Sequence, residues 1–328
     1  TMWNGLLGME FDAFYNYTYD ILTAMGGDYP PSMGGYYYTY ANYNKVDSKG
    51  VEITVSHRNK LNLAGKPFSY GASFNLTFAR NRYLRYPDSP NTVEWRKRTG
   101  RSVDASVVWV AEGLFRSEEE IDNSAWYGTR PNVGDIKYKD VNGDGVINSL
   151  DERPIGYRED STPILNFGLN FSFCWKGFDF AFDFTGGAMG SWYQQWEQRN
   201  PFHDGGNNPQ YYMEDTWRLS DIWDADSELI PGKYPMLLIG NSSHSNYWNS
   251  PFWKKNVRYV KLRNLELGYT LPKHIVEKAL ISDLRFYVAG TNLLTFTNAP
   301  GIDPESTEGN GLGYPTTRII NIGVNLKF

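Results

Sequence analysis

Apolar and polar residues alternate along several stretches of this chain, most regularly between Leu165 and Thr185. Every second residue from Leu165 to Trp175 is Leu, Phe or Trp, the dipeptide Lys176-Gly177 interrupts the pattern, and every second residue is then Phe on the way back. A period of two places one class of side chain on each face of a β-strand. Two such runs around a two-residue turn predict an antiparallel hairpin.

The same alternation predicts eight strands in all. They cover residues 5–21, 50–57, 68–78, 165–175, 178–185, 256–271, 284–295 and 317–328. In the sixth strand the apolar phase slips between Leu262 and Leu265, which indicates a β-bulge near Asn264. A short helix is expected at residues 117–122, because Ser117 and Glu120 have the spacing of a capping box.

The composition decides between two uses of these strands, a soluble sandwich and a membrane wall. Aromatic residues make up 16% of the chain, yet hydrophobic residues total only 41% and mean hydropathy is −0.53. A barrel that shows aromatic girdles to lipid and polar groups to its lumen has this mixture. We therefore predict an all-β fold, a portion of an antiparallel up-and-down transmembrane β-barrel with about eight to ten strands, open as a fragment.

The connections between the strands alternate in length. Short turns at residues 58–67, 176–177 and 272–283 alternate with long loops at 25–43, 81–163, 186–255 and 298–315. Outer-membrane barrels have short periplasmic turns and long extracellular loops, so the long loops are expected outside the cell. For the short turns all to lie on the periplasmic side, residues 81–163 must cross the membrane either twice or not at all. A weak strand signal at 103–110 is thus either a crossing with a partner or part of a hairpin above the membrane.

Several function classes lack support in the sequence. The net charge of −5 provides no basic footprint for nucleic acid. The four histidines are scattered, no hydrolase or nucleotide fingerprint appears, and Cys174 is alone. We therefore expect no enzyme, and a β-sandwich glycosidase is a minor alternative. A soluble carbohydrate-binding β module with a calcium loop is the main alternative to the barrel.

One acidic loop has the spacing of a calcium site. Oxygen ligands at positions 1, 3, 5, 7, 9 and 12 of such a loop, with Gly at position 6, surround Ca²⁺. The candidate ligands in this chain are Asp140, Asn142, Asp144, Val146 (through its carbonyl), Asn148 and Asp151. Asp rather than Glu at position 12 shortens the reach, and an Asn/Gly-rich turn that binds no ion is the alternative. A structural clamp in an extracellular loop is the preferred interpretation.

The long segment 186–255 is crowded with aromatic rings. Rings suit stacking on sugars and burial beneath a partner, while internal packing of a large loop is the alternative for any single ring. The candidates for substrate or partner contact are Trp192, Tyr193, Trp196, Trp217 and Trp223.

Five segments, spread almost end to end and in the right order, resemble a known family. Residues 44–52, 112–121, 134–145, 259–272 and 290–297 are similar to the SusC/RagA class of TonB-dependent outer-membrane transporters; the third contains Asp140-Val141-Asn142-Gly143-Asp144-Gly145. The resemblance covers the C-terminal part of that family only, so we expect residues 1–328 to be the end of a barrel, without the plug domain and the N-terminal strands.

The resemblance also implies a function and its partners. It implies energised import of oligosaccharides or peptides across the bacterial outer membrane, with a surface lipoprotein of the SusD type and with TonB acting through the part outside this chain. Outer-membrane lipid would surround the wall. Phe328 resembles the terminal aromatic by which such barrels are recognised for assembly. The strand it ends is expected to be an exposed edge, prone to aggregation unless something covers it.

Overall fold

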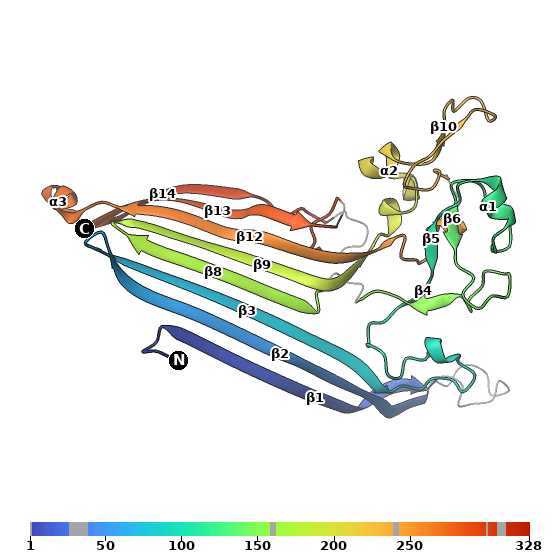
Figure 1. The fold of residues 1–328 in the computed structure, drawn as a ribbon, viewed down its shortest axis with the longest axis horizontal. Helices are drawn as coiled ribbons and strands as arrows, with labels where there is room; N and C mark the ends of the chain where they lie inside the picture. The colour runs from blue at the N-terminus through green and yellow to red at the C-terminus, as the bar shows by residue number, and fades with distance from the viewer. Residues whose placement is uncertain (1, 26–38, 158–161, 239–242, 300, 307–312) are drawn as a thin grey trace.

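The computed structural model describes residues 2–25, 39–157, 162–238, 243–299, 301–306 and 313–328, and within them one long antiparallel sheet dominates (Figure 1). Its eight strands lie side by side in sequence order. They are β1 (Leu7–Met25), β2 (Thr39–Leu63), β3 (Lys66–Arg85), β8 (Leu165–Trp175), β9 (Phe178–Tyr193), β12 (Lys254–Thr270), β13 (Asp283–Thr297) and β14 (Ile319–Lys327). The eight strands predicted from alternation are thereby confirmed.

The turns at one end of the sheet are tight. Lys176 and Gly177 both have positive φ, 51° and 83°, as a two-residue hairpin turn of the primed type requires. The turn expected over 58–67 is shorter than predicted, because β2 and β3 continue until only Ala64 and Gly65 separate them. Part of the loop expected at 25–43 is also strand, since β2 begins at Thr39. These strand extensions were not predicted, because they contain too many polar residues to show apolar alternation.

The two faces of the sheet differ in chemistry. One cross-strand row from β3 to β14 contains Tyr70, Phe173, Phe180, Leu267, Val288 and Ile322. We call this apolar face the outward face. The inward face carries Ser73 and Asn170, which are hydrogen bonded, and the carboxylates of Asp179 and Glu266, which both pair with Arg285.

The long insertion between β3 and β8 contains no strand of the main sheet in its described residues, because β3 pairs directly with β8. The weak strand signal at 103–110 corresponds to β4 (Val107–Trp109), which pairs with β7 (Glu152–Pro154) outside the main sheet. It is therefore not a crossing. β5 (Ala111–Leu114) pairs with β6 (Ile136–Tyr138) nearby.

The remaining elements are short. They are the α-helices α1 (Glu118–Asp122), α2 (Gln210–Glu214) and α3 (Lys273–Val276), the strand pair β10 (Arg218–Leu219) and β11 (Leu229–Ile230), and the 3₁₀ turns η2 (Glu94–Arg96), η3 (Trp196–Gln198), η4 (His203–Gly205), η5 (Ser245–Tyr247) and η6 (Glu277–Ala279). Among the described residues, no helix has the length and apolar character needed to cross a membrane.

Two local predictions can be checked directly. The bulge near Asn264 is confirmed, because the register of β12 shifts between Leu262 and Asn264 against both of its neighbours. The α1 helix is also confirmed, and the Ser117 hydroxyl accepts a hydrogen bond from the Glu120 amide at 3.2 Å. The Glu120 carboxylate accepts from the Arg116 amide rather than from that of Ser117, so the box closes one residue earlier than expected.

Candidate functional site

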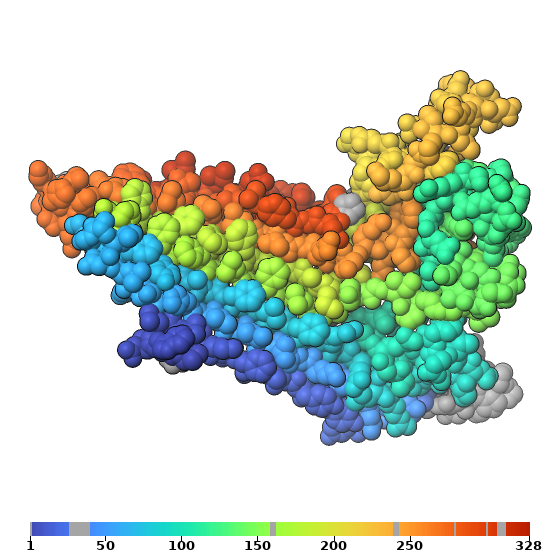
Figure 2. All heavy atoms as spheres, viewed as in Figure 1, coloured from blue at the N-terminus to red at the C-terminus, as the bar shows by residue number. Residues whose placement is uncertain are grey.

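The two long insertions meet in one loop-rich body beyond the end of the sheet, which we call the loop body (residues 86–157, 194–238 and 243–253). It lies opposite the end that holds both labelled termini and the short turns (Figure 1). Figure 2 shows it as a broad mass on the end of the long curved sheet. A body that gathers the two longest insertions of the described chain at one end is the natural candidate for contact with substrate or partner.

A buried asparagine joins the two insertions. Asn246, fully buried, accepts a hydrogen bond from the Ile136 amide at 2.8 Å and donates to the Asp135 carboxylate at 2.7 Å. Its own carbonyl accepts from the Trp253 indole at 2.6 Å. One side chain thereby satisfies polar groups from segments about 110 residues apart, which are costly to leave unpaired when buried.

The core of the loop body is aromatic. Trp253 and Tyr212 are fully buried and pack with Tyr138, Tyr193 and Tyr247. Burial raises the pKa of Tyr247 to about 12 and raises the pKa of Tyr138 further, so both phenols stay neutral at physiological pH. They therefore contribute to the core as neutral packing groups.

The aromatic residues predicted as contacts divide into two groups. Trp192, Tyr193 and Trp217 are buried in three different places. Tyr193 packs in the aromatic core of the loop body, Trp192 packs in a second cluster with Val257 and Tyr259, and the Trp217 ring lies against Gly134. Trp196 and Trp223 are 51% and 90% exposed. Direct contact with a substrate or partner therefore stays a prediction for Trp196 and Trp223, and the structure assigns the other three to packing.

Trp223 stands at the tip of a projecting hairpin. The β10–β11 pair extends away from the loop body in Figure 1, and the connecting residues present Ile222 and Trp223, 73% and 90% exposed. The turn is held by its own polar groups, since the Asp221 carboxylate accepts from the Trp223 amide at 2.9 Å. A large ring is thus presented to solvent on an ordered turn.

The predicted calcium loop is closed by its own hydrogen bonds. The Asp140 carboxylate accepts from the amides of Gly143 and Gly145, both at 2.7 Å, and buried Asp151 accepts from the amides of Val141 and Asn148. In this arrangement the Asn142 and Asn148 side chains turn their NH₂ groups toward Asp144. Calcium would require their oxygens instead.

The acidic loop therefore has a suitable backbone without an assembled ligand set. The described residues contain no group of three or more His, Cys, Asp or Glu side chains placed to share a metal. Hydrogen bonds from Asn142 and the Val146 amide lower the pKa of Asp144, so this carboxylate is charged and exposed at neutral pH. Calcium binding stays a prediction.

Calcium binding by the acidic loop can be tested by titrating calcium into the complete receptor, with calorimetry and thermal melting as readouts. If the loop binds with a dissociation constant of about 0.1–1 mM, as extracellular calcium modules do, several millimolar calcium should give a measurable heat of binding and a higher melting temperature. Asp144→Asn should abolish that response with little loss of stability. Asp151→Asn should lower the melting temperature with or without calcium, because it leaves buried backbone donors unpaired. No heat and no shift in the unaltered receptor would refute the calcium site.

An ion-pair cluster missed by the sequence analysis pins the last long loop. Lys261 on β12 is 1% exposed, and its ammonium lies 2.5 Å from the Asp303 carboxylate and 2.9 Å from that of Glu305. Arg263, the bulge residue, also pairs with Glu305. Ala299 and Ile302 of the same loop pack on Trp192, Val257 and Tyr259. The sequence signal that could have indicated this cluster is Lys261 itself, a lysine among apolar residues next to the break in alternation at Leu262.

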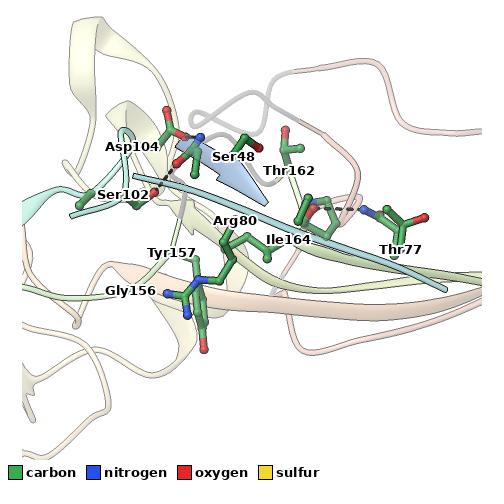
Figure 3. Close-up of a pocket in the computed structure, with 14 residues that line it drawn as sticks. Ser48, Thr77, Arg80, Ser102, Asp104, Gly156, Tyr157, Thr162 and Ile164 are labelled. Atoms are coloured by element: carbon green, nitrogen blue, oxygen red, sulfur yellow. Dashed lines mark hydrogen bonds between the residues drawn. The ribbon is translucent and has the colours of Figure 1, made fainter. Parts of the chain in front are cut away.

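A cavity marks the place where β3 continues beyond the end of β8. Its lining includes Asn81, Ser102 and Asp104, and the Asn81 side chain accepts from the Ser102 hydroxyl at 2.9 Å (Figure 3). Arg80 points away from Ser102 and Asp104 and toward Tyr157. Arg80 lines the same cavity from the other face of β3, beyond the last residue pair of β3 with β8.

Comparisons with known proteins agree with this architecture. No family model matches the chain. It is 26% identical over its whole length to TonB-dependent receptors P3 and P26 of Formosa agariphila, covering 33% of each. The RagAB peptide importer in its open-open and closed-closed states matches 99% of the chain, with TM-scores of 0.69 and 0.67 and identities of 19% and 18%.

The chain spans about a third of the length of these relatives. The sequence similarity reaches across all of its strands and both insertions, and the structural match covers the same residues. Over its whole length the chain is therefore similar to about a third of a TonB-dependent receptor, and it shares the fold of the matching third of the RagAB importer chain.

Proposed function

We propose that this chain is part of the wall and outer surface of an outer-membrane active transporter. The complete transporter imports oligosaccharides or peptides, is energised by TonB and works with a SusD-like lipoprotein. The observation that carries the proposal is the two-faced sheet, apolar on its outward face and polar on its inward face from strand to strand. A barrel wall needs one apolar and one polar face, because lipid contacts its outside and water contacts its inside.

The height of the apolar band supports a membrane wall. On β3 the outward residues are apolar or aromatic from Phe68 to Phe78. At about 3.4 Å per residue and a tilt of about 40°, that stretch spans about 26 Å of membrane. Outer-membrane barrels have an apolar band of about 25 Å.

A soluble carbohydrate-binding module fits the same sheet less well. Its outward residues would face water, and Leu267, Val288 and Ile322 of one row are 46%, 44% and 83% exposed. An apolar surface that crosses eight strands far exceeds the patch of a few hundred Å² that soluble monomers tolerate. Membrane lipid would cover it.

Membrane location and energised uptake can be tested together in the source bacterium. We expect the tagged complete receptor to sediment with the outer membrane, and cells lacking it to lose uptake of at least one member of a fluorescent oligosaccharide and peptide panel. Cells lacking TonB should lose the same uptake. A receptor found in the soluble fraction, or uptake that survives loss of TonB, would refute the proposal.

The projecting hairpin gives a sharper prediction for the lipoprotein. Trp223→Ala should weaken its copurification with the complete receptor about thirtyfold, because exposed Trp residues are the commonest interface hot spots. Trp3→Ala, which removes a 71% exposed Trp outside the loop body, serves as the matched control. Equal copurification of the Trp223→Ala and unaltered receptors would exclude this hairpin as the contact.

A further inference from the structure

On β1, β2 and β3 the outward face changes abruptly from apolar to basic. The last fully apolar row contains Ala13, Val51 and Phe78. The next two rows toward the loop body contain Tyr15, Lys49 and Arg80, then Tyr17, Asp47 and Arg82. The pairing of β2 with β3 is unbroken from Val46 to Leu63, so all of these side chains share the outward face.

Five basic residues form this surface, which we call the basic collar. They are Lys45, Lys49, Arg80, Arg82 and Arg85. Asp47 is the single acidic residue in these rows of β2 and β3; it is 2% exposed and accepts three hydrogen bonds from Arg82. Lys49 and Arg80 are exposed, and within the described chain neither forms an ion pair. The collar thus keeps an excess of positive charge.

The inward residues of these three strands at the same level are uncharged, and the Asp104 carboxylate that accepts from the Asn81 side chain is acidic. Asn16, Ser48 and Asn81 occupy the alternate positions of the same strands. Charge that served a solute in the lumen would lie on these positions. The basic groups instead point to the side that faces lipid further down the strands, so their partner lies outside the wall.

The level of the collar identifies that partner. Arg80 is the next outward residue after Phe78, which marks the upper limit of the apolar band of about 26 Å. Tyr15, Tyr17 and Tyr19 stand beside the collar on β1, 60%, 44% and 61% exposed, as aromatic rings do at a membrane–water interface. The collar therefore lies at headgroup height on the side of the long loops.

We propose that the basic collar binds the phosphate groups of glycolipids in the outer leaflet of the outer membrane. Guanidinium groups bind phosphate with paired hydrogen bonds, and ammonium groups add point charge. Arg85 is held in place for this role, because its guanidinium lies 3.9 Å over the Tyr43 ring. The inference rests on the proposed membrane location and adds a lipid chemistry and a site to it.

The test uses the complete receptor in detergent and phosphorylated lipid A as the probe. Lys49→Gln with Arg80→Gln should weaken lipid A binding, measured by native mass spectrometry, about thirtyfold, and the remaining binding should fall with salt. The matched control, Lys273→Gln with Lys278→Gln, removes the same charge at the short-turn end and should bind as the unaltered receptor does. Melting temperatures should agree among the three proteins. If either double variant fails to fold, the single variants Arg80→Gln and Arg80→Lys are compared, and Arg80→Lys should restore most of the binding lost by Arg80→Gln.

Two further arms separate the sources of phosphate. Lipid A stripped of phosphate should bind equally weakly to the unaltered receptor and the collar variant. Inorganic phosphate that displaces lipid A at comparable concentration would overturn the proposal in favour of a free-anion site. Equal lipid A binding by the collar and control variants would also overturn the proposal. So would a collar variant that binds lipid A normally and no longer copurifies with the lipoprotein. Membrane fractionation of the unaltered receptor judges the proposed location separately.

Discussion

Replacing Trp253 with alanine is expected to destabilise the loop body by about 3–5 kcal/mol, the usual cost of removing a buried Trp. The ring is fully buried among Tyr212, Tyr234 and Phe252, and its indole donates to the Asn246 carbonyl. Its loss leaves a cavity and an unpaired carbonyl at the point where the two insertions join. Limited proteolysis of the complete receptor should then cut within 86–157 and 194–253 while the sheet stays intact.

Trp223→Ala is the matched control for this variant. It removes the same side chain from a position that is 90% exposed, so stability should change by less than about 0.5 kcal/mol. Equal protease resistance of the Trp253→Ala and Trp223→Ala receptors would show that the aromatic cluster does not hold the loop body together.

Lys261→Met is expected to release the last long loop from the sheet. The substitution leaves the partly buried Asp303 carboxylate without its cation and leaves Glu305 with Arg263 alone. Breaking a buried pair costs about 3–5 kcal/mol, and less here because Glu305 is partly exposed and keeps one partner. Hydrogen exchange should rise in the described parts of 298–316, and Arg263 alone should not retain the loop.

The triple variant Lys261→Met, Asp303→Asn, Glu305→Gln isolates the charge effect. Removal of both partners together is often nearly neutral, because no buried charge is left uncompensated. Exchange in the loop should therefore return most of the way to that of the unaltered receptor. Equally fast exchange in the single and triple variants would mean that packing of Ala299 and Ile302, and no ion pair, holds the loop.

Period-two alternation predicted the wall well because each strand carries its own signal. Lys176-Gly177 and the phase slip at Asn264 were readable for the same reason: both are local. The upper parts of β2 and β3 were missed, since Lys49 and Arg80 break the apolar period although they continue the strand.

The candidate site was less predictable because its contacts are distant in sequence. Trp192 and Trp223 have the same chemistry, and the sequence pattern does not show that one is 1% and the other 90% exposed. The Asn246 junction and the Lys261 pairs each join residues separated by more than forty positions. Their partners are chosen by the folded arrangement of the loops.

The tight turns and large insertions have different consequences for change over evolution. A residue inserted at Ala64-Gly65 or Lys176-Gly177 would shift the register and exchange the outward and inward faces of a whole strand. An insertion between β9 and β12 leaves the register untouched, and doubling a loop costs only about 0.6 kcal/mol of closure entropy. Receptors of this architecture can therefore acquire new recognition surfaces by exchanging loops on a wall that stays constant.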